Sequence, residues 1–322
     1  MKILVVGGSY FLGRWFVQHA YKRHEITVLN RGNIPIGLDN VTELVADRHN
    51  NDELCKLKAL NFKYDAVVDF CAYYRNDIRQ ILENLGATPG RYIYLSTVDV
   101  YKKQSGCALD ESSELVDADE VMTDTEQRTN DPVEKGSGSE AEYIRGKALL
   151  EHELITECDS RNIRGVSVRP AILYGPGNYA PRESIYLEWI RRAGQIIHPV
   201  DSDGYFQMLY VSDAAMGLLK LCEIPQDELK RAYNFCTEQI LNYDDFERAL
   251  AGAFSLFDPS GSDKQIFSKV DVTVDTVIER NIPLPFPLTG AGSCLYSGNL
   301  FKDLGIRITP LEEGLLACIR VS

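Results

Sequence analysis

ILVVGGSYFLG, residues 3–13, sets four consecutive apolar residues directly before a turn that contains three glycines. A buried strand that runs through such a turn into a helix is typical of a phosphate-binding loop, because the backbone amides at the helix N-terminus face the pyrophosphate. Gly7 permits the tight turn, and Gly13 lets helix and strand pack closely. Tyr10 stands where a glycine is usual, so its phenol must point away from the phosphates or cover them. A plain glycine-rich β–α turn is the alternative.

The first half of the chain alternates short apolar runs with helical segments. Strands are predicted at Ile3–Val6, Ile26–Leu29, Leu44–Ala46, Ala66–Phe70, Tyr92–Ser96 and Gly165–Arg169. Helices are predicted at Leu12–Tyr21, Asp52–Leu60, Asp77–Leu85 and Glu140–Glu157. Apolar strands separated by helices indicate an α/β fold with a doubly wound, parallel Rossmann-type sheet covered on both faces.

The alternation breaks down after Pro170, where Gly and Pro punctuate residues 174–181, 199–204 and 281–293. We therefore expect a dinucleotide-binding domain over residues 1–172 and a smaller, mixed α/β substrate domain over residues 173–322. A predicted strand at Ala232–Cys236 returns to the first domain, so the two domains are expected to interleave.

Charge argues against a nucleic-acid partner. The 322 residues carry a formal net charge of −13, whereas nucleic-acid binding requires clustered Lys and Arg. Residues 110–142 hold twelve acidic residues against Arg128 and Lys135, a local net charge of −10. This segment is expected to be an acidic surface insertion or lid.

The pattern of cysteines and the N-terminal sequence indicate the cellular compartment of the protein. The eight cysteines are scattered and form no C-x-x-C pair, which favours reduced thiols over zinc or a disulfide framework. The apolar run after Lys2 is too short for a signal core or a membrane span. We expect a cytoplasmic protein with no membrane partner and no metal. The five histidines show no metal-ligand spacing.

The end of the second strand reads Val28-Leu29-Asn30-Arg31-Gly32. A carboxylate here would hold the ribose 2′-hydroxyl of NAD and repel a 2′-phosphate. Asn30 removes that repulsion and Arg31 can pair with the phosphate, so NADP is predicted, with NAD as second choice. Asp47, after the third strand, could accept a hydrogen bond from the adenine amino group or could be a turn residue.

A hydroxyl follows the fifth predicted strand at Thr97. Side chains at the carboxyl end of a parallel strand project toward the ligand crevice, where Thr97 could orient a substrate oxygen. The competing interpretation is a structural threonine that caps the following turn.

Tyr143 and Lys147 lie four residues apart, so a helix places both on one face. An ammonium beside a phenol favours the phenolate and lowers the phenol pKa from about 10. Such a tyrosine can exchange a proton with an alcohol or ketone near neutral pH. Alone the spacing is weak, because a half-buried tyrosine beside a solvated lysine is common.

The order of these motifs resembles the extended short-chain dehydrogenase/reductases, the NAD-dependent epimerase/dehydratase family, over essentially the whole chain. The loop with Tyr10 resembles a divergent, "atypical" branch. The resemblance rests on GGSYFLGR, Asp47, STVDVY, the acidic pair at 110–111, Tyr143 with Lys147, Arg169-Pro170 before Tyr174-Gly175-Pro176, YVSD at 210–213 and TPLEEG at 309–314.

The resemblance implies a role for each matching residue. Tyr143 would be the acid/base, Lys147 would lower its pKa and hold the nicotinamide ribose, and Thr97 would complete the catalytic set. The residues then expected at the cofactor are Gly7, Ser9, Tyr10, Phe11, Leu12, Gly13, Asn30, Arg31, Asp47, Arg48, Phe70, Cys71, Ala72, Tyr143, Lys147, Pro170 and Ile172. The residues expected at the substrate are Tyr73, Asp99 and Gln207.

Two departures narrow the expected chemistry. Sugar-nucleotide dehydratases of this family typically follow the hydroxyl residue with Asp and Glu, but Val98 and Asp99 follow Thr97, which disfavours water elimination. The run Tyr205–Leu209 lacks the arginine that usually holds a nucleotide-sugar diphosphate. We expect a sugar or nucleotide-sugar epimerase or ketoreductase, acting on a small molecule and resembling its relatives in forming a homodimer. The alternative is a non-catalytic NADP-binding regulatory or scaffold protein.

Overall fold

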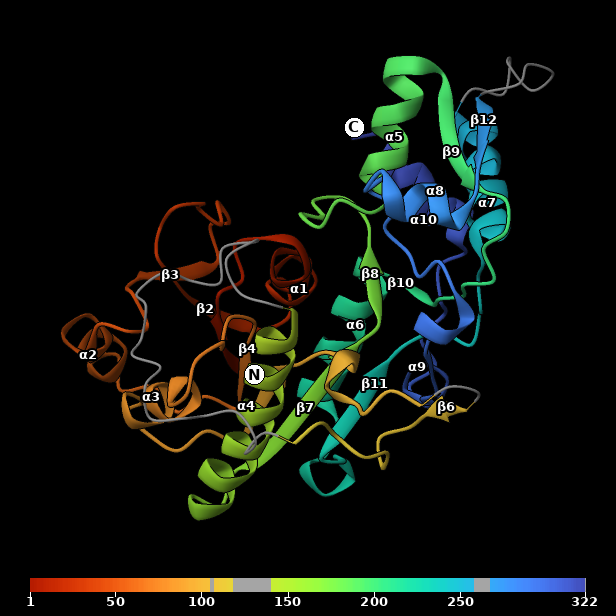
Figure 1. Ribbon diagram of the computed structural model, residues 1–322. Helices are drawn as coiled ribbons and strands as arrows, with labels where there is room; N and C mark the ends of the chain where they lie inside the picture. Colours follow the sequence, from red (N-terminus) through yellow and green to blue (C-terminus); the bar gives the residue numbers. More distant parts are fainter. Residues whose placement is uncertain (105–106, 118–139, 258–266, 322) are drawn as a thin grey trace. The chain divides into compact units, whose positions relative to one another are not determined.

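Figure 1 shows the computed structural model. Strand β1 (Lys2–Val6) runs into helix α1 (Phe11–Ala20) through a glycine-containing turn. The structure describes residues 1–104, 107–117, 140–257 and 267–321. Most of the acidic insertion expected at 110–142 therefore lies outside the described residues. The described chain divides into two compact units, formed by residues 1–102, 111–170 and 215–235, and by residues 103–110, 171–214 and 236–322.

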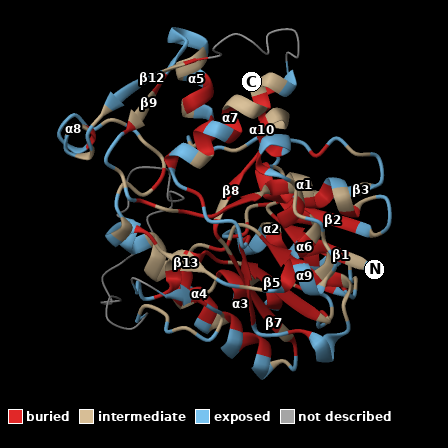
Figure 2. Cartoon of the chain, turned by 90° about the vertical axis from the view of Figure 1, so that its right-hand side faces the viewer, coloured by how far each residue is buried: buried red, intermediate tan, exposed pale blue. Residues whose placement is uncertain are grey.

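The first unit contains a parallel sheet of seven strands in the order β11-β7-β5-β4-β1-β2-β3. Its strands beyond β1 are β2 (Glu25–Asn30), β3 (Val41–Val45), β4 (Ala66–Asp69), β5 (Arg91–Leu95), β7 (Arg164–Pro170) and β11 (Ala232–Phe235). The inner strands are almost wholly buried, as β1 and β5 illustrate, whereas the edge strand β3 is partly exposed (Figure 2). This confirms the predicted parallel α/β sheet.

Helices cover both faces of the sheet. Helices α2 (Asn51–Ala59), α3 (Asp77–Glu83) and α4 (Glu140–Ser160) share one apolar cluster with side chains such as Leu4, Val67 and Tyr92. On the other face, the end of α1 meets the end of α6 (Val211–Glu223), where Glu223 bonds His24 at 3.0 Å. Two 3₁₀ turns, η1 (Val98–Val100) and η3 (Gln226–Glu228), follow β5 and α6.

The second unit is mixed and has an aromatic core. Its helices are α5 (Glu183–Ala193), α7 (Tyr243–Phe257), α8 (Val274–Glu279), α9 (Leu300–Asp303) and α10 (Leu311–Ile319), with a 3₁₀ turn η5 (Gly290–Gly292). Three short parallel pairs join β10 (Met208–Tyr210) to β8 (Ile172–Tyr174), β12 (Ser268–Val272) to β9 (Gln195–Pro199), and β13 (Leu295–Tyr296) to β6 (Ala108–Leu109). Phe206 stacks on Phe286 with ring centroids 4.0 Å apart.

Candidate active site

Lys147 is a buried ammonium on α4. Its Nζ donates to the carbonyl oxygens of Ala72 at 3.2 Å and Leu95 at 2.9 Å, beyond the end of β4 and at the end of β5. Burial lowers the pKa of Lys147 to about 8, even though the carboxylate of Asp69 acts in the opposite direction. The side chain is 3% exposed, so this amine is held at the carboxyl edge of the sheet rather than solvated.

Three tyrosine rings surround that amine. The Nζ of Lys147 lies 4.4 Å from the ring centroid of Tyr73, 4.9 Å from that of Tyr94 and 5.9 Å from that of Tyr143. Aromatic faces carry partial negative charge and stabilise a nearby cation. The structure thus brings Tyr143 and Lys147 together, and it adds Tyr73, which the sequence predicted at the substrate.

Thr97 caps the turn η1. Its Oγ1 accepts a hydrogen bond from the backbone N–H of Asp99 at 3.2 Å and donates to the Asp99 carboxylate at 2.8 Å. The capping interpretation of Thr97 therefore has a direct structural basis. The same turn packs against α4, which places Thr97 and Asp99 beside the helix that carries Tyr143.

The loop between β1 and α1 is a tight and closely packed turn. Gly7 and Gly8 have φ angles of 93° and 72°, and a Cβ on Gly13 would lie 2.6 Å from the Cα of Gly8. Tyr10 is 52% exposed and gives the start of α1 no side-chain cap. The predicted loop residues therefore fit a dinucleotide, because the turn is tight, the backbone is closely packed, and Phe11 and Leu12 are themselves buried.

Asn30 lies at the end of β2, as expected, but its side chain is engaged by neighbours. The Nδ2 amide donates to Ser9 Oγ at 2.9 Å and to the carboxylate of Glu43 at 2.6 Å. Arg31 is exposed. Glu43 was missed from the sequence because it lies on the next strand, 13 residues further along the chain.

Arg48 forms part of a buried ion-pair network below the sheet edge. Its guanidinium donates to both oxygens of Asp69, at 2.9 and 3.0 Å, and to the backbone carbonyl of Asp77. Tyr92 donates to the same Asp69 carboxylate at 2.6 Å. A role for Arg48 at the cofactor stays a prediction, since these partners already hold its side chain.

The remaining predicted cofactor residues show mixed environments. Asp47 accepts from the backbone N–H of His49 at 2.9 Å, the geometry expected of a turn residue. Cys71 lies beside Arg48, and burial raises the pKa of its thiol to about 11. Phe70 is half-buried after β4. Pro170 ends β7 in the first unit.

In the second unit, Ile172 begins β8. The side-chain amide of Gln207 there bonds backbone groups: it donates to the carbonyls of Thr237 and Tyr296 and accepts from the Tyr296 N–H. A substrate role for Gln207 stays a prediction.

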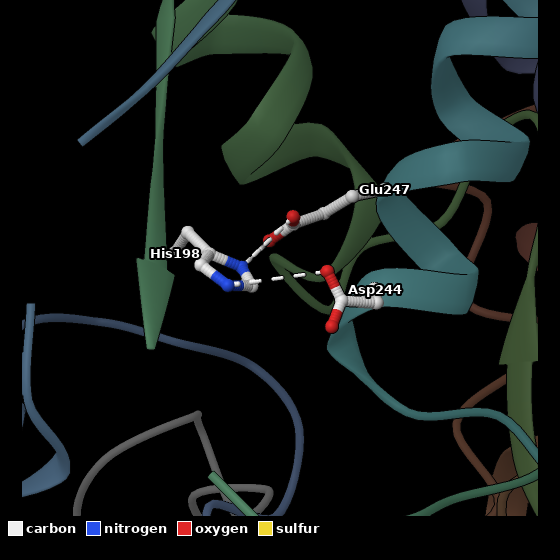
Figure 3. A group of neighbouring side chains, drawn as sticks. All are labelled: His198, Asp244 and Glu247. Carbon is white, nitrogen blue, oxygen red and sulfur yellow. Dashed lines mark hydrogen bonds and ion pairs between the residues drawn. The ribbon is translucent and has the colours of Figure 1, made fainter. Parts of the chain in front are cut away.

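A second polar cluster, which the sequence did not reveal, lies in the second unit (Figure 3). His198 on β9 bonds Glu247 at 3.1 Å, and Asp244 lies one helical turn before Glu247 on α7. The ammonium of Lys269 on β12 lies 2.6 Å from Glu247 and 3.2 Å from Asp244. A lysine thus already holds the position that a metal ion would need between these carboxylates.

Within the described chain, no helix combines the length and apolarity that a membrane crossing demands.

The parallel sheet, the glycine turn before α1 and the polar groups at the strand ends define a Rossmann-like, dinucleotide-binding class of fold. The sequence profile of the NAD dependent epimerase/dehydratase family matches residues 3–236, more than half of the chain. The protein therefore belongs to this family, which confirms the resemblance noted from the motifs.

Solved structures share the fold over the whole chain. The UDP-glucose 4-epimerase of Thermus thermophilus in complex with NAD is 17% identical, covers 100% of this chain and 98% of its own, and has a TM-score of 0.70. The UDP-glucuronic acid 4-epimerase of Bacillus cereus in complex with UDP-glucuronic acid and NAD is 18% identical, with 100% and 98% covered and a TM-score of 0.69. At these identities the likeness shows the fold.

A curated relative has a name that does not refer to an epimerase. The chloroplast stem-loop binding protein of 41 kDa b of Arabidopsis thaliana is 25% identical over 274 residues. The match covers 80% of this chain and 64% of that protein, so the chain spans less than two thirds of its length.

Proposed function

We propose that the protein is an NAD(P)-dependent oxidoreductase that transfers hydride at a carbinol or ketone carbon of a sugar or nucleotide-sugar, with Tyr143 as acid/base. The overall reaction would be an epimerisation or a ketone reduction. Family membership and the names of the two solved epimerases support the substrate class. The missing arginine between Tyr205 and Leu209 favours a substrate held without a strong diphosphate contact.

One observation carries the proposal: a buried lysine with a lowered pKa lies one helical turn from a tyrosine. The hydrogen bonds of Lys147 go to two backbone carbonyls rather than to a carboxylate. Burying an ammonium in this way is costly, and a group tuned close to neutral pH is characteristic of a functional site. A merely structural lysine would gain more by reaching solvent.

Each residue at the site would have a separate role in such a reaction. Nicotinamide, when bound, supplies or accepts the hydride. Tyr143 would hold the proton that moves to or from the substrate oxygen, and the positive charge of Lys147 favours the phenolate. Thr97 and Asp99, fixed by the turn η1, would orient that oxygen through the hydroxyl of Thr97.

The dinucleotide would lie along the loop from Gly7 to Gly13, with its adenosine ribose near Asn30. Asn30 and Arg31 favour NADP in the sequence. A homodimer and a cytoplasmic location stay predictions.

Replacement of Tyr143 by Phe tests the proposal. Turnover is expected to fall by about 10²–10⁴-fold, because the proton donor is lost, while the dissociation constant for the dinucleotide stays within about 3-fold. The assay is a panel of nucleotide-sugars, free sugars and small ketones, each supplied with NADH and NADPH. Tyr21→Phe, at the far end of α1, is the matched control.

Retained turnover in Tyr143→Phe would remove Tyr143 from the mechanism. Mass spectrometry of nucleotide carried through purification distinguishes the two reactions. A tightly retained cofactor indicates an epimerase that recycles it within one turnover, whereas a freely exchanged cofactor indicates a reductase.

A second candidate is a protein that binds the dinucleotide without turnover and acts as a regulator or scaffold. The name of the Arabidopsis relative motivates this alternative, with a nucleic-acid stem-loop as the ligand to try. The net charge of −13 opposes it, because nucleic-acid binding depends on phosphate contacts from Lys and Arg. Fluorescence anisotropy with a labelled stem-loop at low and high salt, with and without NADH, decides between them. Salt-sensitive binding together with a silent substrate panel would favour the regulator.

A further inference from the structure

A carboxylate lies at the end of β2 although the sequence has none there. The Nδ2 of Asn30 lies 2.6 Å from Glu43 Oε1, and the second oxygen of Glu43 accepts from the backbone N–H of Ile36 at 3.3 Å. Two separate contacts therefore fix the Glu43 carboxylate beside the side chain that follows the dinucleotide loop.

The register of the sheet explains how Glu43 arrives there. Strands β2 and β3 pair in parallel with Val28 opposite Glu43 and Asn30 opposite Val45. The Glu43 side chain leaves β3 two residues before the strand ends and extends toward its carboxyl edge, where it reaches Asn30. A one-residue shift in this register would turn Glu43 to the other face of the sheet.

The same amide connects this carboxylate to the loop. Asn30 Nδ2 also donates to Ser9 Oγ at 2.9 Å, so Ser9, Asn30 and Glu43 form a continuous chain of hydrogen bonds. Any group that approaches the Asn30 amide from the loop must also approach Glu43. A hydroxyl can donate to a carboxylate, whereas a phosphate placed there would meet a like charge.

Two arginines could also place positive charge here, because Arg31 follows Asn30 and Arg14 contacts Ile36, whose N–H binds Glu43. Arg14 of α1 donates to the carbonyl oxygens of Pro35 and Ile36, at 3.2 and 3.4 Å. Arg31 is exposed, where its attraction for a phosphate is screened by water and salt. The half-buried carboxylate of Glu43 is the better-fixed charge beside Asn30.

We infer that Glu43, supplied by β3, takes over the place of the missing carboxylate at the end of β2, accepts the adenosine ribose 2′-hydroxyl, and makes this an NAD site. This reverses the preference for NADP that Asn30 and Arg31 predict. The inference rests on the proposed function, since it requires a dinucleotide on the loop from Gly7 to Gly13.

Glu43→Gln tests the inference, because it removes the charge and keeps the shape. Dissociation constants for NADH and NADPH are measured by calorimetry on the full chain. The wild type is expected to bind NADH at least about 10-fold more tightly than NADPH. Glu43→Gln should tighten NADPH by about 10-fold and change NADH by less than about 3-fold. Glu25→Gln, an exposed carboxylate at the opposite end of β2, is the control and should change neither.

Arg31→Ala supplies a second variant whose exposed site carries little risk for folding. It is expected to leave the ratio of the two constants within about 3-fold of the wild type, since Arg31 would not decide the selectivity. A wild type that prefers NADPH, or a selectivity that Arg31→Ala alters and Glu43→Gln does not, would overturn the inference and leave the proposed function standing. Failure of both dinucleotides to bind would overturn the proposed function and the inference with it.

Discussion

Lys147 on α4 and Lys269 on β12 represent two opposite ways to hold a cation in this protein. Lys147 is buried against carbonyl oxygens and tyrosine rings, and its pKa is lowered to about 8. Burial alone would also lower the pKa of Lys269, but its contacts with Glu247 and Asp244 raise it above the ordinary value. A buried cation without a carboxylate partner lowers the stability of the fold, whereas a paired cation stabilises its unit. A cost of the first kind is typical of functional sites.

The same substitution at both lysines sharpens this contrast, and the largest effect is expected at Lys147. Lys147→Met should lower turnover by about 10²–10⁴-fold, because Tyr143 loses the charge that favours its phenolate. The panel assay described for Tyr143→Phe measures this loss. Turnover within about 3-fold of the wild type would contradict a catalytic role for the amine.

Although Lys147→Met should lose turnover, we expect this variant to be more stable than the wild type. The shift in pKa from 10.5 to about 8 corresponds to on the order of 3 kcal/mol against the buried charge, from which the lost hydrogen bonds must be subtracted. We expect a net gain on the order of 1 kcal/mol at pH 7 by urea unfolding.

This gain should depend on pH. The unfolded chain binds more protons than the folded chain between about pH 8 and 10.5, so the wild type gains stability as the pH rises through that range. The advantage of Lys147→Met is therefore complete below about pH 8 and shrinks toward pH 10.5. A pH-independent difference would show that folding does not lower the pKa of Lys147.

Lys269→Met should instead destabilise the protein, by about 1–3 kcal/mol. Glu247 is 1% exposed and would lose a partner at 2.6 Å, while the 40% exposure of Lys269 keeps the effect below that of a fully buried pair. Urea unfolding measures the loss, and turnover should stay within about 2-fold. The double variant Lys269→Met/Glu247→Gln should recover most of the stability; if it does not, the pair is not the cause.

The smallest effect on stability is expected on the exposed face of helix α7, which also carries Glu247. Arg248 and Asp245 form an ion pair at 3.0 Å with side chains 73% and 36% exposed. Arg248→Ala should change the free energy of unfolding by less than about 0.5 kcal/mol, because water and salt screen the pair. A loss as large as that of Lys269→Met would show that burial does not decide these effects.

Local patterns predicted the fold well, since apolar runs and helix signals act over a few residues. The strand predicted at Ala66–Phe70 is β4 at Ala66–Asp69, and the helix predicted at Glu140–Glu157 is α4 at Glu140–Ser160. The spacing of Tyr143 and Lys147 was equally readable, because a helix converts four residues into one shared face.

Contacts between segments far apart in the chain could not be predicted from the sequence. Glu43 reaches Asn30 only through the register of two strands, and Lys269 reaches Glu247 from another element entirely. Arg48 was predicted at the cofactor, but its pairing with Asp69 depends on where β4 ends. Such partners are set by packing rather than by spacing along the chain.

The interleaved course of the chain has a consequence for its synthesis. Strand β7 gains its outer neighbour β11 only after residues 171–214, which belong to the second unit, have been translated. Until residue 235 leaves the ribosome, the backbone N–H and C=O groups on the outer edge of β7 are open to pairing with other nascent chains. Chaperone protection during translation, rather than the stability of the finished fold, would then limit the yield of this protein at high expression.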